Sequence, residues 1–429
     1  MKVEPASEIR GDIAVPGVKG ISQRAVLLGA VADGESVIRG FGRAADTDSA
    51  ITAVRALGVQ VDDEDVDVVR VHGVGLRGLR PSGEPIDCGN AGTVMRLLTG
   101  LLAGQKGRFE LVGDESLSAR PQERVAEPLR QMGAHVETAD GHAPVRIEGA
   151  ELRPIRYELP VASAQVKTAI LFAGLYARGG RTTVAEPLPS RDHTERLLPA
   201  LGVRVQQGAH EVSVWSAHRL EPLELDIPGD FSAAAPFVVA SALVPGSQLR
   251  VHGVNVNPTR TGLLDFLERM GVRIALFNRR TAGGEPVADL EIRSPERDLR
   301  AAEIGRDDVP RMVDELPLFA LAAGLARGES VVRGAEELRV KESDRIDAVT
   351  EALRAIGVRI EARRDGFRIR GVPNRPTGGR IDAHGDHRIA MLGAVAGLVS
   401  RDGVEVEDAG SVVISFPGFF DLLDSVTRR

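Results

Sequence analysis

Cysteine is almost absent from this chain of 429 residues, in which Cys88 is the single example. A disulfide bond within the chain is therefore impossible, and the count argues strongly against a metal site built on cysteine. Aromatic residues make up only 3% of the sequence, too few for the stacking platforms that bind single-stranded nucleic acid. The formal net charge of -7 argues against a broadly basic DNA-binding surface, although it leaves room for a local basic cleft.

Long apolar runs are missing as well. No window of about 18 uninterrupted apolar residues occurs, so we expect no membrane-spanning segment. The first residues, MKVEPASEIRGDIAVPG, combine charges with prolines and lack the apolar core of a secretory signal. Together with the single cysteine, these absences favour a cytoplasmic protein.

A repeated pattern is present along most of the chain. A helical stretch followed by a large apolar residue, a glycine and a small apolar residue ends at Val59, Ala134, Val203, Val272 and Val358. Glycine at that position supplies the left-handed residue that closes a helix. Strand-like alternation then follows each time, at 69–73, 145–149, 212–216, 290–294 and 367–371.

A second type of helix precedes each of these units. It is rich in alanine, leucine and valine nearly all round, as expected for a buried helix. Six such segments occur, at 21–32, 93–103, 163–177, 231–244, 314–326 and 387–399. The sequence therefore predicts an α/β protein of six copies of one unit, each with a strand, a buried helix, a strand, an amphipathic helix and a hairpin.

Six units of similar size suggest two domains of three units. A Pro-Gly pair at 228–229 lies between the third and fourth units, and another at 16–17 lies just before the first. We expect residues 16–228 to form one domain and residues 1–15 with 229–429 to form the other. Two crossings between the domains would make a double hinge.

A polar motif stands at or near the start of every buried helix. The motif residues are Lys19, Ser22 and Arg24; Asn90, Gly92, Thr93 and Arg96; Ser163, Gln165 and Lys167; Asp230 and Ser232; Asp314 and Glu315; Asp386, His387 and Arg388. Helix N-termini attract anions, so six of them with added cations suggest an electropositive cleft. Ser22, Thr93, Ser163 and Ser232 have a simpler alternative role as N-caps, although six caps would not each need a distinct charged signature.

Three further features have competing interpretations. If the segment ELRVKESDRI (337–346) is strand-like up to Lys341, it leads into a helix that starts near Glu342. Lys341, Glu342 and Arg345 could then share one face. The alternative is a lattice of surface ion pairs. HGDHR (384–388) is too poor in ligands for a metal site. Cys88 is better explained as a small buried apolar residue than as a nucleophile.

In order along the chain, nine motifs resemble the 5-enolpyruvylshikimate-3-phosphate (EPSP) synthase family, the 3-phosphoshikimate 1-carboxyvinyltransferases. They are PGVKGISQR, GNAGTVMR, GDESLSARP, SAQVKTA, SRDHTERLL, PGDFSAAA, DELPLFAL, ELRVKESDRI and GDHRIAM. Their details look closer to the second of the family's two bacterial classes. The resemblance implies two similar domains, each of three βαβαββ repeats, in an arrangement like an inverse α/β barrel.

The resemblance also implies an activity. Family members transfer the enolpyruvyl group of phosphoenolpyruvate to the 5-hydroxyl of shikimate 3-phosphate and release phosphate, in the route to chorismate and the aromatic amino acids. They are the target of glyphosate and need no metal or organic cofactor. We therefore expect a cytoplasmic transferase that acts as a monomer, with no nucleic-acid or membrane partner.

Residue roles follow from the same resemblance, position by position. The catalytic acid/base candidates are Asp314, Glu342 and Lys19. The positions that match shikimate 3-phosphate contacts are Lys19, Gly20, Arg24, Ser163, Gln165, Arg191, Asp314 and Lys341. The positions that match phosphoenolpyruvate contacts are Lys19, Gly92, Arg120, Gln165, Arg345 and Arg388. Whether Lys19 or Glu342 protonates the enol carbon stays open.

Two positions depart from the family's pattern. Gly20 stands where a serine usually follows the lysine, which removes a hydroxyl contact to the substrate phosphate, and Ile414 replaces a lysine that the second class often lacks. The nearest rival is the related transferase that acts on UDP-N-acetylglucosamine, but the loop GDESLSARP lacks that family's reactive cysteine. A catalytically silent homologue that binds polyanions is the remaining alternative, and Gly20 is its only support.

Overall fold

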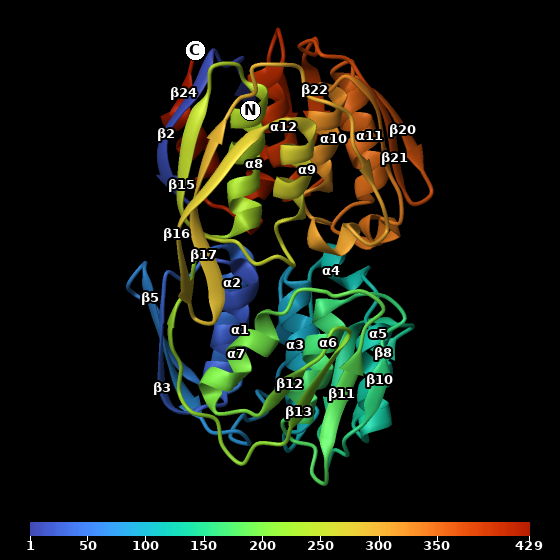
Figure 1. Cartoon of the computed structure of the whole chain (residues 1–429). Coiled ribbons are helices and arrows are strands. Elements are labelled where there is room, and N and C mark those ends of the chain that lie inside the picture. Colours follow the sequence, from blue (N-terminus) through green and yellow to red (C-terminus); the bar gives the residue numbers. More distant parts are fainter. The chain divides into compact units, whose positions relative to one another are not determined.

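The chain divides into two compact units in the computed structural model, which describes all 429 residues (Figure 1). Unit 1 comprises Met1–Pro16, Gly229–Arg280 and Pro286–Arg429, and unit 2 comprises Gly17–Pro228 and Thr281–Glu285. Each unit has its own apolar core. No helix has the length and apolar character needed to cross a membrane.

Unit 2 contains three four-stranded sheets, in the orders β14-β3-β5-β4, β6-β7-β9-β8 and β10-β11-β13-β12. Their strands are β3 (Asp33–Arg39), β4 (Gln60–Asp62), β5 (Val68–Val74), β6 (Ile86–Asp87), β7 (Arg108–Val112), β8 (His135–Ala139), β9 (His142–Glu148), β10 (Arg156–Glu158), β11 (Arg181–Ala185), β12 (Val205–Gln207), β13 (Glu211–Trp215) and β14 (Glu224–Asp226). In each sheet one parallel pair is followed by two antiparallel pairs, as a βαβαββ unit requires.

The helices of unit 2 are of two kinds. The buried helices are α1 (Lys19–Ala30), α3 (Gly92–Leu102) and α6 (Ala164–Gly174). The others are α2 (Ala45–Ala56), α4 (Glu115–Ser118), α5 (Glu123–Met132), α7 (His193–Leu197) and the 3-10 helix η1 (Leu198–Leu201).

Unit 1 repeats the scheme with sheets ordered β16-β17-β15-β2-β24, β18-β19-β21-β20 and β1-β23-β22. Their strands are β1 (Lys2–Val3), β2 (Glu8–Ala14), β15 (Gln248–Asn255), β16 (Arg273–Ala282), β17 (Glu285–Arg293), β18 (Glu303–Ile304), β19 (Gly328–Val332), β20 (Arg359–Arg363), β21 (Gly366–Gly371), β22 (Gly379–Asp382), β23 (Val404–Glu407) and β24 (Thr427–Arg428). Because β2 pairs in parallel with β15, the N-terminal residues complete a sheet of the C-terminal half of the chain.

The helices of unit 1 also form two sets. Those buried nearly all round are α8 (Phe231–Leu243), α10 (Leu316–Gly324) and α12 (His387–Val399). The remaining ones are α9 (Gly262–Met270), α11 (Arg345–Ala355), α13 (Phe419–Val426), and the 3-10 helices η2 (Val309–Arg311), η3 (Glu336–Val340) and η4 (Ala409–Ile414).

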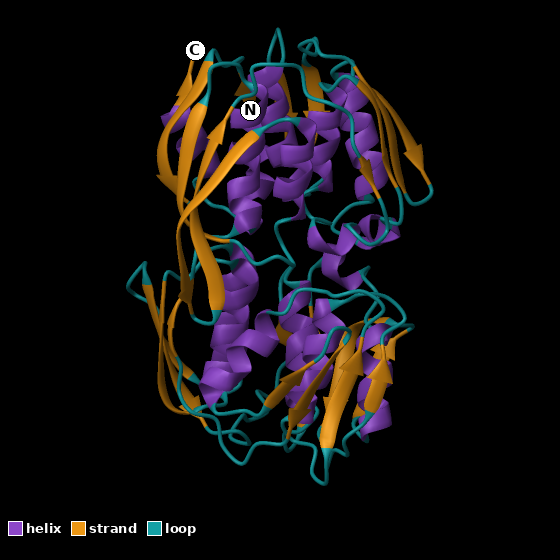
Figure 2. Cartoon of the chain, viewed as in Figure 1, coloured by secondary structure: helices purple, strands orange, loops and turns teal.

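The predicted α/β architecture of six repeats is confirmed. Each unit has three sheets and three buried helices, with the helices inside and the sheets around them (Figure 2). Glycines close the helices as the sequence pattern required: Gly133 follows α5 with a φ of 105° and Gly271 follows α9 with a φ of 112°. At both positions the left-handed backbone is costly for any residue with a Cβ.

Two predictions about this architecture are wrong in detail. Residues 337–341 do not form a strand, because η3 occupies Glu336–Val340, and α11 begins at Arg345 where Asp344 caps it by accepting from the Ile346 and Asp347 amides. The segment 229–429 does not stay in one unit either. The turn Thr281–Glu285 of the β16–β17 hairpin belongs to unit 2, where Arg196 Nη1 donates to the Gly284 carbonyl over 3.2 Å.

Candidate active site

The helix N-termini of the two units are capped differently. In unit 2, α1 and α3 begin without a side-chain cap, and Ser163 caps α6 through the Val166 amide. In unit 1, Asp230 caps α8 and Asp386 caps α12. The capping alternative thus holds for Ser163 but not for the other three hydroxyl residues. Ser22 lies inside α1, Ser232 follows the true cap, and Thr93 accepts a hydrogen bond from Gln165.

Lys19, Gly20 and Arg24 lie together on the first turns of α1. Lys19 Nζ is 2.7 Å from Asp46 Oδ2 of α2. The Arg24 guanidinium donates to the Gly20 carbonyl over 2.8 Å, to Thr194 Oγ1 over 2.8 Å and to Thr168 Oγ1 over 3.0 Å. Two cations are therefore fixed beside an uncapped helix start, a combination suited to binding an anion.

A second cationic group surrounds the start of α3. Arg96 donates to Gln165 Oε1, whose amide nitrogen in turn donates to Thr93 Oγ1 over 2.9 Å. Arg120 donates to Asn90 Oδ1 over 2.6 Å and to Ser116 Oγ over 3.1 Å. A Cβ added at Gly92 would lie 3.3 Å from Arg96 Nη1 and 3.4 Å from Arg120 Nη1, so both guanidinium groups approach this glycine.

The remaining residues of unit 2 have separate surroundings. Ser163 stands at the start of α6, and Arg191 is half-buried in the loop between β11 and α7. Lys167 is fully buried, and its Nζ is 2.7 Å from both Glu186 Oε1 and Glu195 Oε1. Although burial lowers the pKa of Lys167, the two glutamates outweigh burial and raise it. This lysine is thus a structural ion-pair partner rather than an anion ligand.

Unit 1 gathers carboxylates around one buried arginine. Arg345 Nε is 2.8 Å from Asp386 Oδ2, its Nη2 is 2.7 Å from Glu342 Oε2, and its Nη1 is 3.2 Å from Asp314 Oδ1. Burial would lower the pKa of Arg345, but Asp386 and Glu342 raise it. Burial likewise would raise the pKa of Asp386, but Arg345 holds it below its usual range. The structure thus brings Asp314, Glu342 and Arg345 together.

Two further cations lie near this cluster. Arg388 is in the first turn of α12, where its amide donates to Asp386 Oδ1 over 2.9 Å and its Nη1 donates to the Ser232 carbonyl over 3.2 Å. Lys341 directly follows η3, 3.9 Å from Glu337 Oε1. Burial lowers the pKa of Lys341, against the opposing charges of Asp314 and Glu337. The alternative of a surface ion-pair lattice therefore fits Lys341, which is partly exposed and lies near Glu337. It does not fit Arg345, which is fully buried.

Neither a metal cluster nor a reactive thiol competes with this anion chemistry. No group of three or more histidine, cysteine, aspartate or glutamate side chains is placed to hold a metal ion. Cys88 is buried, and burial raises the pKa of its thiol, so it is an apolar core residue as the sequence indicated.

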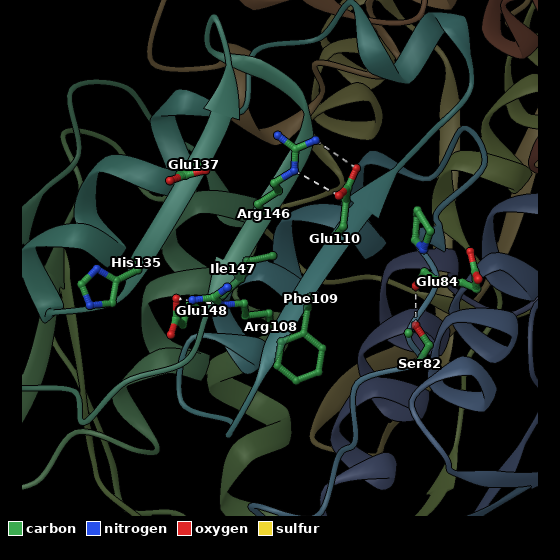
Figure 3. Close-up of a pocket in the computed structure, with 12 residues that line it drawn as sticks. Ser82, Glu84, Arg108, Phe109, Glu110, His135, Glu137, Arg146, Ile147 and Glu148 are labelled. Carbon is green, nitrogen blue, oxygen red and sulfur yellow. Dashed lines mark hydrogen bonds and ion pairs between the residues drawn. The ribbon is translucent and has the colours of Figure 1, made fainter.

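An open pocket of about 480 Å³ lies on the outer side of the β6–β9 sheet of unit 2 (Figure 3). Charged side chains of the strands line it and pair with one another. Arg146 Nε is 3.0 Å from Glu110 Oε2, and Arg108 Nε is 3.1 Å from Glu148 Oε2. None of the predicted site residues lines the pocket, and we assign no ligand to it.

Comparison with known proteins gives the family. The family model of EPSP synthase (3-phosphoshikimate 1-carboxyvinyltransferase) matches residues 3–423. The chain belongs to this family. The 3-phosphoshikimate 1-carboxyvinyltransferase of Salinibacter ruber is 46% identical over 430 residues, covering 99% of each chain, and that of Citrifermentans bemidjiense is 49% identical over 429 residues, covering 100% of this chain and 99% of the relative.

Solved structures agree with the assignment to EPSP synthases. EPSP synthase from Acinetobacter baumannii superposes with a TM-score of 0.87 at 40% identity, covering 99% of this chain and 97% of the other. The enolpyruvyl transferase NikO from Streptomyces tendae gives a TM-score of 0.79 at 19% identity, over 99% and 96% of the chains, and so supports the fold alone. The expected transferase is confirmed, and the silent homologue is not supported.

Several residues that contact the expected site residues were not assigned a role from the sequence. Arg96 was named as a motif residue only, although its position one helical turn after Gly92 is the signal that places it beside Arg120. The partners of the cations had no local signal, because they come from distant parts of the chain. They are Asp46, Asn90, Thr168 and Thr194.

Proposed function

We propose that this chain transfers the enolpyruvyl group of phosphoenolpyruvate to the 5-hydroxyl of shikimate 3-phosphate, and that its two clusters divide the work. The first cluster, the cation set of unit 2, contains Arg24, Arg96 and Arg120 and binds the anionic groups. The second, the Arg345 cluster of unit 1, contains Asp314 and Glu342 and performs proton transfer. The observation that carries this proposal is the contact of Arg345 with two acid/base candidates in a chain of this family.

Substrate binding is assigned by residue type and position. Arginine forks pair bidentately with phosphate and carboxylate, and lysine adds a compact positive charge. In unit 2 we assign shikimate 3-phosphate to Lys19, Arg24, Ser163, Gln165 and Arg191, and phosphoenolpyruvate to Lys19, Gly92, Arg120 and Gln165. In unit 1 we assign shikimate 3-phosphate to Asp314 and Lys341, and phosphoenolpyruvate to Arg345 and Arg388.

The chemistry then follows from three proton and bond changes. Asp314, held beside the Arg345 cation, accepts the proton of the 5-hydroxyl. Protonation of the methylene carbon of phosphoenolpyruvate, by Lys19 or Glu342, makes the neighbouring carbon electrophilic, and the 5-oxygen attacks it. The resulting tetrahedral ketal phosphate expels inorganic phosphate and loses a proton from its methyl group, which gives the enolpyruvyl ether.

Phosphate release tests this proposal directly. With shikimate 3-phosphate and phosphoenolpyruvate together, we expect stoichiometric inorganic phosphate and enolpyruvyl ether, and none when either substrate is omitted. Release from phosphoenolpyruvate alone would indicate a phosphatase instead. Turnover should persist after chelator treatment, and loss of activity that a divalent ion restores would contradict the metal-free site.

Closure of the two domains around the substrates is a further part of the proposal. The assigned residues divide between the units, and the chain crosses between them at two Pro-Gly pairs and again at the hairpin turn. Exclusion of water would protect the reactive ketal intermediate. Small-angle scattering should show a smaller radius of gyration with shikimate 3-phosphate and glyphosate bound. An unchanged radius would count against closure.

A monomeric, cytoplasmic enzyme remains our expectation. Light scattering coupled to size-exclusion chromatography should return the mass of one chain, 45.7 kDa. A stable larger mass would contradict the monomer.

A further inference from the structure

The segment Arg191–Glu195 contains more interacting side chains than the proposed function uses. It is the centre of the SRDHTERLL motif and opens α7, and only Arg191 has a substrate role above. The three residues from His193 to Glu195 have partners elsewhere in unit 2. His193 Nδ1 is 2.7 Å from Glu285 Oε1 at the hairpin turn, Thr194 contacts Arg24, and Glu195 contacts Lys167.

Thr194 and its neighbour Thr168 hold the Arg24 guanidinium along one edge, the edge that carries Nε and Nη2. Arg24 Nε donates to Thr194 Oγ1 over 2.8 Å and Nη2 donates to Thr168 Oγ1 over 3.0 Å. The two hydroxyl oxygens are 2.7 Å apart, so one hydroxyl donates to the other. All three side chains are buried, and α1 and α7 lie side by side (Figure 1). Two contacts on a planar fork fix both its position and its plane.

An ion pair lies next to the threonine pair, between Lys167 of α6 and Glu195 of α7, and helps to hold it in place. Lys167 precedes Thr168 and Glu195 follows Thr194, and the Lys167 ammonium is 2.7 Å from the Glu195 carboxylate. Helices α6 and α7 are therefore joined at two consecutive positions, once by charges and once by hydroxyls. The hydroxyl pair cannot move far from Arg24 without breaking the buried ion pair, which is costly.

We propose that Thr168 and Thr194 are positioning residues that fix the Arg24 guanidinium for the phosphorylated substrate. This inference rests on the proposed role of Arg24. An arginine side chain has several rotatable bonds, so a guanidinium that is ordered before the substrate arrives loses less freedom on binding. Replacing a hydroxyl by a methyl group leaves the buried Nε–H of Arg24 without that acceptor, and the guanidinium moves to find another.

Calorimetric titration with shikimate 3-phosphate tests the inference in four proteins. Thr194→Val keeps the shape of the side chain and removes the hydroxyl, and we expect it to weaken binding about tenfold. Thr194→Ser keeps the hydroxyl and should stay within about twofold of the unmodified chain. Thr182→Val is the matched control, because the buried Thr182 hydroxyl makes no hydrogen bond, and it should leave the affinity unchanged. Equal affinities for Thr194→Val and Thr182→Val would overturn the inference.

A double-variant cycle separates this inference from the role of Arg24. If Thr194 acts through Arg24, Thr194→Val weakens binding in the unmodified chain but has no further effect in Arg24→Met. Additive effects of the two substitutions would mean that Thr194 acts by another route. An unchanged affinity in Arg24→Met alone would instead refute the substrate role of Arg24. Should Thr194→Val fail to fold, Thr168→Val gives the same cycle from α6.

Discussion

The buried Arg345 of unit 1 and three arginines of unit 2 have chemically different hydrogen-bond partners. In unit 2, Arg24, Arg96 and Arg120 donate hydrogen bonds to neutral oxygens of hydroxyl, amide and carbonyl groups. In unit 1 the buried Arg345 is held by the carboxylates of Asp314, Glu342 and Asp386. Neutral acceptors fix a guanidinium without cancelling its charge, whereas carboxylates do both.

This difference matches two tasks. A guanidinium oriented by neutral oxygens attracts an anionic ligand, which suits the binding of two phosphorylated substrates. A guanidinium between carboxylates holds those groups in place, which suits proton transfer, and Arg345 also keeps the pKa of Asp386 below its usual range. In this account the two units differ in function because the partners of these arginines differ.

The largest expected effect concerns the proton acceptor of unit 1. Asp314→Asn removes the base but keeps a side chain that hydrogen-bonds, and a positioned base contributes about 10²- to 10⁴-fold. We expect turnover to fall by that factor while the affinity for shikimate 3-phosphate changes little. Steady-state rates and calorimetry measure the two quantities. Near-normal turnover would show that another group is the base.

Replacing Arg345 in unit 1 and Arg24 in unit 2 tests this difference between the clusters through the free energy of unfolding. Arg345→Met leaves the buried Asp386 charge unpaired, so we expect the free energy of unfolding to fall by about 3–5 kcal/mol. Arg24→Met removes hydrogen bonds to the neutral oxygens of Gly20, Thr168 and Thr194 and should cost about 1–3 kcal/mol. Urea unfolding compares them, and Arg345→Met/Asp386→Asn should recover part of the loss. A larger loss in Arg24→Met would contradict the difference between the clusters.

The pH dependence of the same variant has a defined sign. Arg345 lowers the pKa of Asp386, so this carboxylate stabilises the native chain above its unfolded pKa of about 3.9, and the stabilisation is lost as the pH falls through the lowered value. In Arg345→Met, the lowering effect of Arg345 is lost, and burial together with the charge of Glu342 raises that pKa. The stability lost through the substitution should therefore increase between about pH 4 and pH 7. A loss that does not depend on pH would contradict this role of Arg345.

We expect Gly20→Ser to strengthen the binding of shikimate 3-phosphate through the unit 2 site. Gly20 lies in α1 without a positive φ, and an added Cβ would have Arg24 Nη1 at 3.4 Å, so a serine fits. A hydroxyl bonded to a phosphate contributes about 1.5–3 kcal/mol, and we expect an affinity gain for shikimate 3-phosphate nearer tenfold than a hundredfold. Turnover should change little. Weaker binding by calorimetry would mean that the site needs the space at Gly20.

The smallest expected effect concerns Gly92. A Cβ at this position would lie 3.3–3.4 Å from Arg96 and Arg120, so Gly92→Ala displaces one or both guanidinium groups by a few tenths of an ångström. We expect the KM for phosphoenolpyruvate to rise about threefold, with the affinity for shikimate 3-phosphate unchanged. A change confined to shikimate 3-phosphate would show that these arginines serve the other substrate.

The fold was predictable because its signals are local. Helix-closing glycines, buried helices and alternating strands repeat along the chain, so six units emerge without any knowledge of long-range contacts. The errors occurred where a local pattern had two solutions. Charge alternation at 337–341 resembled a strand, but the Asp344 cap fixed α11 three residues later than expected and left a 3-10 turn before it.

For the site, the sequence predicted only residues that lie in contiguous motifs. The resemblance gave Lys19, Arg24 and Arg345 by position, since their motifs are contiguous. Their partners were not accessible in this way. Arg24 meets Thr168 and Thr194 across 144 and 170 residues of chain, and this contact exists only once α1, α6 and α7 have packed together.

The most direct test of the division of work compares two variants in the same two assays. Shikimate 3-phosphate affinity by calorimetry and turnover at saturating substrates are measured for Arg24→Met and Asp314→Asn. A crossed result is expected: Arg24→Met loses affinity and keeps most of its turnover, while Asp314→Asn keeps affinity and loses turnover. If both variants lose the same quantity, the two clusters do not divide binding from chemistry.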